Sequence, residues 1–364
     1  MARRTTWRTR ILRGVVLALL ALLLYLALWP TPVDPSARTV APAPALVGVF
    51  APNQRLRDGI ASVDLGEGPE DVALGPDGLL YTGLADGRIL RLPVSLASAQ
   101  PWADTGGRPL GLAFDRDGRL LVADAHRGLL AIDPDAEVHV LVDAFDGAPL
   151  RLTDELAIAA SGAVWFTDAS TRFAVEDHVL DALENRATGR LLRHEPTTGE
   201  TTLVLDGLRF ANGVALAPDE SFVLVAETFD YRVTRHWLRG PDAGRTDVLV
   251  ADLPGFVDNL TYADDGVLWV ALVSRRSALL DATLPWPWVR KVIARVPMAL
   301  QPIPPRYGFV LGIDADGGVV HNLQDDSGTV GAITSAVPVG DELVLGSLRS
   351  RVLVRVPRPQ VPAR

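Results

Sequence analysis

Residues 210–228 read Phe-Ala-Asn-Gly-Val-Ala-Leu-Ala-Pro-Asp-Glu-Ser-Phe-Val-Leu-Val-Ala-Glu-Thr, and this stretch decides the fold. Two apolar runs, 214–216 and 222–226, flank the turn sequence Pro-Asp-Glu-Ser, so the stretch predicts two antiparallel strands joined by a turn. The polar Asn212 stands just before the first strand, where packing of a hydrophobic core does not require an amide.

The same pattern recurs along the chain as a polar or small group, a short strand, a turn of the Asp-Gly type and a more apolar strand. Its six copies lie at residues 68–82, 108–122, 152–166, 210–228, 257–270 and, less regularly, 330–345. A spacing of about 40–60 residues is typical of the blades of a β-propeller, whose small sheets bury their faces by stacking around an axis. We therefore predict an all-β six-bladed β-propeller. A β-sandwich lacks so long a repeat.

The composition narrows the functions that the chain can have. The protein has 364 residues, a net charge of −9, a sequence pI near 5.2 and no cysteine. The acidic balance argues against nucleic acid as a partner. The absence of cysteine excludes disulfides and thiolate metal sites.

The N-terminus predicts a membrane anchor. Arginines in residues 1–13 precede an uncharged apolar run, 14–29, and Tyr25 and Trp29 suit the membrane interface. A cleaved signal peptide is the alternative, although Leu-Trp-Pro at 28–30 is a poor cleavage site. We expect a single-pass protein with a cytoplasmic N-terminus and an extracytoplasmic propeller. The predicted parts are a cytoplasmic basic tail (1–10), a transmembrane anchor (11–29), a linker (30–55) and the propeller (56–360).

Two stretches interrupt the repeat. Residues 171–187 suggest a short helix, and residues 277–307 are rich in proline, tryptophan and other apolar residues. We expect both to be insertions over one face of the disc. The second could cap a pocket, contact the membrane or cover a blade.

Polar residues recur where the chain enters the inner strands, and in a propeller these entry points meet at the mouth of the central channel. They are Glu70, Thr153, Asn212, Asp258 and Asn259, with Asp71 and Asp154 as neighbours. Carboxylate, amide and hydroxyl oxygens suit Ca²⁺, which takes six to eight oxygen ligands in loose geometry. No His or Cys stands at these positions, which disfavours zinc. The alternative is that these side chains cap turns.

Several ordered motifs carry a family resemblance, which covers essentially residues 1–357. The chain resembles the strictosidine synthase-like branch of the calcium-dependent six-bladed propellers, some of which combine a cytoplasmic N-terminus, one spanning helix and a propeller. The wider superfamily includes gluconolactonases, regucalcin and paraoxonases. The motifs are Gly-Pro-Glu-Asp at 68–71, the segments 122–130, 165–170, 209–214, 224–228 and 253–259, and Leu-Gly-Ser at 345–347.

The resemblance implies roles for individual residues. By position, Glu70, Asn212 and Asp258 match calcium ligands of the superfamily, and Asn259 matches a further ligand of paraoxonase-like members. Thr153 stands where many members have Asn, so that ligand is weakened or replaced by water. The positions of the paraoxonase-like histidine pair read Leu110 and Asp124, and the segment 333–335 lacks the glutamate of true strictosidine synthases. Strictosidine synthase-type condensation is therefore not expected.

The resemblance predicts a membrane-anchored, calcium-dependent esterase or lactonase that acts on a small-molecule ester or lactone. The metal would polarise the carbonyl, and a side chain at the same mouth would act as general base. The candidates are Asp258, Asp168 and His126. The competing hypothesis is a non-enzymatic binding module with structural calcium. The substrate and the oligomeric state stay open.

Overall fold

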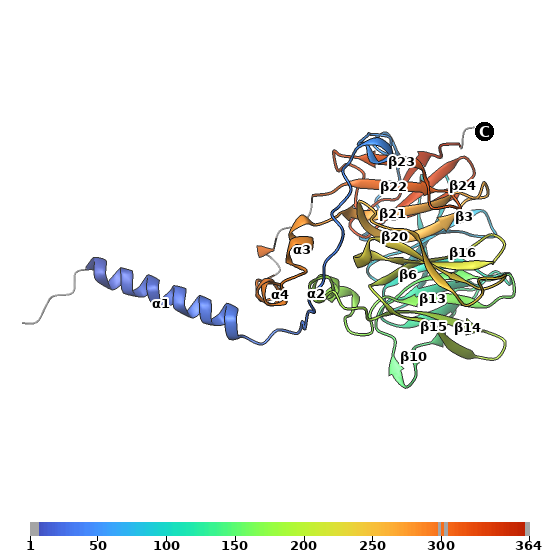
Figure 1. The fold of residues 1–364 in the computed structure, drawn as a ribbon. Coiled ribbons are helices and arrows are strands. Elements are labelled where there is room, and N and C mark those ends of the chain that lie inside the picture. The colour runs from blue at the N-terminus through green and yellow to red at the C-terminus, as the bar shows by residue number, and fades with distance from the viewer. Residues whose placement is uncertain (1–6, 298–299, 302–304, 361–364) are drawn as a thin grey trace, which may run out of the picture. The chain divides into compact units, whose positions relative to one another are not determined.

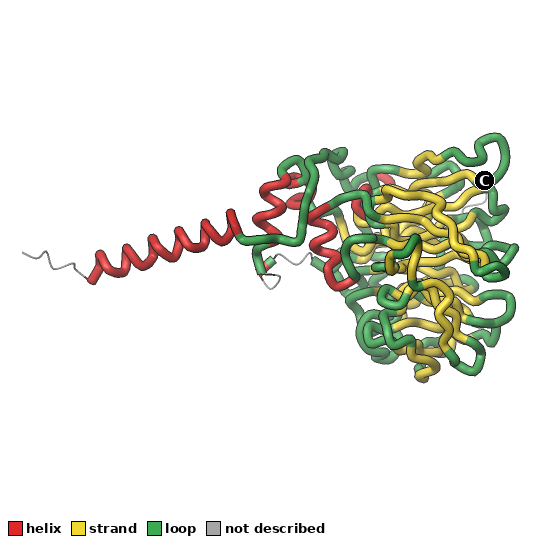
Figure 2. Tube along the Cα trace, turned by 90° about the horizontal axis from the view of Figure 1, so that it is seen from below, coloured by secondary structure: helices red, strands yellow, loops and turns green. Residues whose placement is uncertain are grey.

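The computed structural model describes residues 7–297, 300–301 and 305–360; residues 1–6 of the predicted basic tail lie outside this part. In the described residues the chain forms six four-stranded antiparallel sheets and one two-stranded hairpin. Successive sheets follow the chain from blue to red in Figure 1, and the strands are yellow in Figure 2. The predicted six-bladed propeller is confirmed.

The first three blades and the small hairpin come from the N-terminal half of the chain. Their strands are β2 (Val72–Leu74), β3 (Leu79–Gly83), β4 (Arg88–Pro93), β5 (Gln100–Asp104), β6 (Pro109–Phe114), β7 (Leu120–Asp124), β8 (Gly128–Ile132), β9 (Val138–Val142), β10 (Ala144–Phe145), β11 (Ala148–Pro149), β12 (Thr153–Ile158), β13 (Val164–Asp168), β14 (Gly189–Glu195) and β15 (Glu200–Leu208).

The last three blades follow, and the sixth also takes the first strand of the chain. Their strands are β16 (Ala211–Leu216), β17 (Phe222–Glu227), β18 (Arg232–Trp237), β19 (Thr246–Val250), β20 (Gly255–Tyr262), β21 (Leu268–Arg275), β22 (Gly308–Ile313), β23 (Val319–Asp325), β24 (Ile333–Val339), β25 (Glu342–Ser347), β26 (Val354–Pro357) and β1 (Ile60–Ala61).

The first strand of each blade lies on the axis. β2, β6, β12, β16, β20 and β24 contact one another in ring order, and β24 returns to β2. The ring is closed by pairing between the two ends of the propeller, since β1 is antiparallel to β26 with Ile60 opposite Arg355. The start of every first strand, and therefore the predicted site, lies at one end of this axis.

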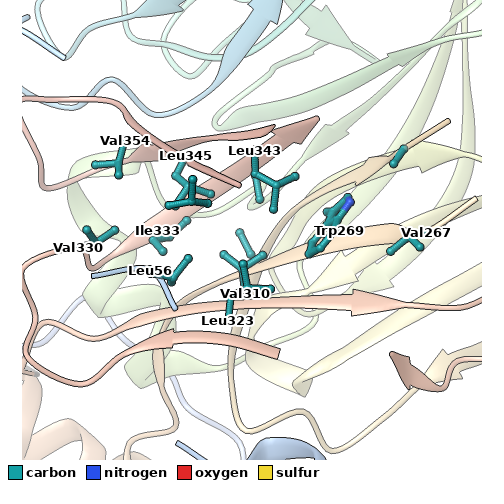
Figure 3. Close-up of a cluster of buried hydrophobic side chains, with 14 residues drawn as sticks. Leu56, Val267, Trp269, Val310, Leu323, Val330, Ile333, Leu343, Leu345 and Val354 are labelled. Carbon is teal, nitrogen blue, oxygen red and sulfur yellow. The ribbon is translucent and has the colours of Figure 1, made fainter. Parts of the chain in front are cut away.

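The hydrophobic core is divided among the six contacts between neighbouring blades. One buried cluster joins blades 5 and 6 and contains Trp269, Val310, Leu343 and Leu345 (Figure 3). Five further clusters join the other neighbouring pairs in the same way. Because each sheet buries both faces, its second strand is almost continuously apolar, as in the fully buried β7.

A second compact unit comprises the described residues of Met1–Thr39, Val179–Arg186 and Ala278–Ile303, and we describe it separately. It contains α1 (Trp7–Leu28), most of α2 (His178–Glu184), α3 (Ala278–Thr283) and α4 (Pro287–Ala294). The helix α1 is long and apolar enough to cross a membrane, and none of its residues is buried.

The unit that contains the propeller also has three short 3-10 helices, which are η1 (Gly48–Phe50), η2 (Val175–Asp177) and η3 (Thr228–Asp230).

Because the hydrophobic core lies between the blades, a Leu→Ala substitution should lower the free energy of unfolding most at those contacts. Leu345→Ala removes a side chain that is 2% exposed in the cluster between blades 5 and 6, so we expect the free energy of unfolding to fall by about 2–5 kcal/mol. Leu203→Ala makes the same change in β15 at a side chain that is 45% exposed, and should cost about 0.5 kcal/mol or less. Urea unfolding followed by circular dichroism measures both, and equal losses would contradict this division.

Candidate functional site

Five of the six first strands, all except β2, share an irregularity at the same place. The pairing with the second strand shifts register between Pro109 and Leu112 in β6, and at the corresponding point in β12, β16, β20 and β24. A β-bulge takes residues out of the ladder and turns their side chains in a new direction, which is why bulges often lie beside functional sites.

The bulges hold most of the predicted ligands. Asn212 lies in the bulge of β16, and Asp258 and Asn259 lie in that of β20. In blade 1, Glu70 comes two residues before β2. The structure thus gives these four residues equivalent positions at one end of the axis, as the repeat predicts.

In blade 3 the residue at the entry position differs by one from the residue that the sequence indicated. Thr153 is still paired in the ladder, opposite Asp168, and the bulge that follows it holds Asp154 and Glu155. Asp154 therefore occupies the place that Asn212 and Asp258 have in their blades. The sequence indicated Asp154 only as a neighbour, because turn spacing fixes a strand entry less sharply than pairing does.

The predicted ligands share one property. Five side-chain oxygens are enclosed and have no hydrogen-bond partner: Glu70 Oε2, Thr153 Oγ1, Asn212 Oδ1, Asp258 Oδ1 and Asn259 Oδ1. Their side chains are no more than 5% exposed. Buried polar atoms almost always have a partner, so five such atoms in one channel need an ion or water to satisfy them. We call these five residues the channel ring.

The chemistry of the channel ring fits a hard cation. Two carboxylates, two amides and a hydroxyl are oxygen donors of the kind that Ca²⁺ takes, in numbers below its full coordination. In the described part of the chain, no three His, Cys, Asp or Glu side chains form a metal-binding group by themselves. Any cation here therefore depends on the amide and hydroxyl oxygens as well as on the carboxylates.

The electrostatics of the channel also favour a cation. Burial raises the pKa of Glu70 and of Asp71 to about 7, and it raises the pKa values of Asp154, Glu155 and Asp258 well above their usual range. Repulsion among these carboxylates adds to the shifts of Glu70, Asp154, Glu155 and Asp258. A cation bound beside them would stabilise the ionised forms.

Arg108 is a residue of this site that the sequence reasoning missed. It is 5% exposed, and its charge opposes the raised pKa of both Glu70 and Asp154. Its Nη1 donates to the carbonyl of Gly68 at 3.3 Å. Gly68 has a φ of +67°, and a Cβ there would lie 2.7 Å from the guanidinium, so glycine is needed at that position. The only indication in the sequence was that this arginine directly precedes the apolar residues of one repeat copy.

Two histidines, His126 and His178, lie in the segments that follow β7 and β13. His126 Nε2 is 2.6 Å from Glu176 Oε1, and its side chain is 40% exposed. Burial disfavours ionisation of Glu176, but a backbone hydrogen bond, His126 and Arg108 together lower its pKa. His178 Nδ1 is 2.8 Å from the carbonyl oxygen of Val175, and burial lowers the pKa of His178 below 6.5.

Asp168 has a different environment from the channel ring. It is fully buried at the end of β13, where Oδ1 accepts from the backbone of Arg151 and Leu152, and Oδ2 pairs with Arg190 at 2.8 Å. Asp124 and Glu227 accept backbone N–H groups in the same way at the ends of β7 and β17. These contacts tie the entry loops to the second strands, so the structure gives Asp168 a supporting role.

Apolar side chains lie beside the entry points. Leu110 and Leu152 belong to a small buried cluster, against which Val175 and Phe210 pack. Phe210 also contacts Phe229, with ring centroids 4.8 Å apart. It has a φ of +59°, which is costly for a bulky residue and places strain two residues before Asn212. Apolar side chains therefore lie beside the strand entries that carry the polar channel ring.

The fold and this site define a six-bladed propeller with an oxygen-lined axial channel. Profiles described as strictosidine synthase and as strictosidine synthase-like, N-terminal, match residues 154–241 and 48–92. Protein STRICTOSIDINE SYNTHASE-LIKE 4 of Arabidopsis thaliana is 34% identical, with 85% of each chain covered. Adipocyte plasma membrane-associated protein of Salmo salar is also 34% identical, with 97% of this chain and 92% of the relative covered. The chain belongs to the strictosidine synthase-like family.

Solved structures share the fold. A gluconolactonase from Xanthomonas campestris superposes with a TM-score of 0.62 at 19% identity, covering 91% of this chain and 99% of the other. Regucalcin from Agrobacterium tumefaciens, described as a calcium-binding protein, gives 0.59 at 16% identity, covering 81% and 92%. At these identities the likeness shows the propeller and leaves activity to be argued from this chain's own residues.

The environment of Asp168 predicts a stability effect. Arg190→Met leaves that buried carboxylate without its cation, so we expect a loss of about 3–5 kcal/mol in the free energy of unfolding. Arg193→Met makes the same change on the same strand, where the ion pair with Glu195 is partly exposed, and should cost about 1 kcal/mol or less. Urea titration compares the two variants. Similar losses in the free energy of unfolding would contradict a structural role for the Asp168–Arg190 ion pair.

Proposed function

We propose that this protein is a membrane-anchored, calcium-dependent hydrolase of esters or lactones. The observation that carries the proposal is the set of five enclosed, unpartnered oxygens in the channel ring. The raised pKa values of Glu70 and Asp258 support it, because carboxylates that are costly to ionise alone are suited to holding a cation.

Glu70, Asn212, Asp258 and Asn259 would hold the ion, with blade 3 contributing Thr153, or Asp154 from its bulge. A bound Ca²⁺ supplies Lewis-acid polarisation of a carbonyl oxygen and stabilises the charge that develops there. The burial of the channel ring keeps bulk water away from these groups, which strengthens every charge interaction among them.

The chain's other residues suggest how a substrate would be held. The buried cluster of Leu110 and Leu152, with Phe210 packed against it, borders the strand entries, so the acyl or aryl group of an ester bound there would meet apolar side chains. This favours an apolar ester or lactone over a sugar derivative, whose hydroxyl groups need several polar partners.

His178 is our candidate proton acceptor. The carbonyl of Val175 can only accept, so Nδ1 carries the proton and Nε2 of the neutral ring is free to take one. The lowered pKa keeps the ring neutral at neutral pH. His126, the candidate from the sequence, has its Nε2 engaged by Glu176.

For the membrane, we propose that α1 spans the bilayer with the N-terminus in the cytoplasm. Arg8, Arg10 and Arg13 stand on the N-terminal side of its apolar run, and positive residues favour the cytoplasmic side. Relatives named adipocyte plasma membrane-associated protein support a membrane location. The propeller would then lie outside the cytoplasm.

The first test is hydrolysis of a panel of aryl esters and lactones by the full chain, with Ca²⁺ and with chelator. We expect turnover that chelator abolishes and Ca²⁺ restores. Glu70→Gln and Asp258→Asn should lose calcium binding by calorimetry and most of the turnover. Asp117→Asn, the same kind of change at an exposed turn, should retain both.

Other outcomes of this test separate the hypotheses. Binding of Ca²⁺ with a raised melting temperature but no turnover on any substrate would favour a binding module with a structural ion. Full hydrolysis by a folded Glu70→Gln variant that binds no Ca²⁺ would refute the proposed mechanism.

The role of His178 has its own prediction. Activity that needs its neutral form should fall as pH drops through the pKa, so the acidic limb of kcat/KM should have a midpoint below 6.5. His178→Gln should remove this limb and most of kcat, with little change in KM. His126→Gln should keep the limb. If the pH profile of His178→Gln is unchanged, another group accepts the proton.

A further inference from the structure

The hairpin of α3 and α4 exposes large apolar side chains. Leu279 is 52% exposed, and Trp286 and Trp288 at the start of α4 are 56% and 66% exposed. Neighbouring exposed tryptophans are unusual on a water-facing surface and often mark an interaction site. We call Leu279, Trp286 and Trp288 the hairpin surface.

The hairpin is attached to the end of α1. Arg295, just after α4, donates through Nη1 to the carbonyl of Leu26 at 3.0 Å and through Nε to the carbonyl of Trp29. Tyr25 Oη donates to the carbonyl of Arg295 at 2.9 Å. Three hydrogen bonds therefore join the last turn of the apolar helix to the C-terminal end of α4.

Buried contacts fix the orientation of α4. Arg290 is fully buried, and its Nη1 donates to the carbonyls of Leu183 and Glu184 at 3.0 Å each. Its Nη2 donates to the carbonyl of Leu284 at 3.0 Å. Its Nη2 also donates to the carbonyl of Ser36. Rotating Arg290 outward would break hydrogen bonds to four carbonyls, so α4 cannot roll at low cost to bury its tryptophans.

We propose that the hairpin surface docks into the outer phospholipid leaflet of the bilayer that α1 crosses. At about 1.5 Å per residue, Trp288 lies about 10 Å along the helix from Arg295, and so close to the end of α1. Tyr25 and Trp29 mark that end as interfacial, and tryptophan is the side chain enriched at this depth. The proposal rests on α1 being a membrane anchor.

The charged side chains near the hairpin indicate whether docking requires anionic lipid. Lys291 is paired with Asp34 at 3.0 Å, and Asp34 also pairs with Arg186. The cations around the hairpin are thus engaged within the protein. Docking should depend on apolar insertion and should be as strong on zwitterionic phosphatidylcholine as on anionic lipid.

The absence of cysteine allows a direct test, because one introduced cysteine can carry a single fluorescent label. The full chain with Trp288→Cys, labelled with an environment-sensitive dye, is reconstituted into phosphatidylcholine vesicles containing nitroxide-labelled lipid. Leu20→Cys inside α1 reports insertion of the anchor, and Val140→Cys on β9 sets the background. Leu279→Cys repeats the measurement where Trp288→Cys fails to fold.

We expect the dye at position 288 to show a blue-shifted emission and several-fold more quenching than at position 140, approaching that at position 20. Quenching at 20 but only background at 288 and 279 would overturn the proposal while leaving the anchor intact. Background quenching at all positions would overturn the anchor and the proposal together. Hydrolysis is not used as a readout, so failure of the proposed activity does not affect this result.

Discussion

The burial of apolar blade faces is the constraint on which the rest of the structure depends. A four-stranded sheet with apolar residues on both faces, such as that built around β7, is stable only between two others. Six contacts between blades satisfy all six sheets only when the ring closes. Closure fixes the first strand of every blade on the axis, so that entry residues far apart in the chain meet at one end.

The channel then combines two costs that a cation can offset together. The bulges at Asn212 and Asp258 take backbone out of the ladder, and burial makes the carboxylates there hard to ionise. An oxygen-seeking ion would satisfy unpartnered atoms and compensate the charge at once. The proposed site and the stability of the fold are therefore linked, since the channel ring contains buried oxygens that have no hydrogen-bond partner within the protein.

The sequence predicted the number of blades and the strand entries, and it indicated all five residues of the channel ring as candidate ligands, because a repeat of turns and apolar runs marks equivalent positions. It did not distinguish Thr153 from Asp154, since only strand pairing shows which residue lies in the bulge. Arg108 and the proposed proton acceptor His178 were not singled out from the sequence for another reason. Their roles depend on contacts with Gly68 and Val175 across loops, and an isolated basic residue in a sequence carries no such information.

The pairing of β1 with β26 also has a consequence for biogenesis. The strand at Ile60 is the first strand of the propeller to be made, but its partner at Arg355 follows all the other strands in the chain order. Local blades can form while the chain emerges, whereas the joint between β1 and β26 cannot form until β26 has been made. Until then the nascent propeller is an open arc with two exposed sheet edges. Chaperone protection of these edges during synthesis would then matter most for the last blade.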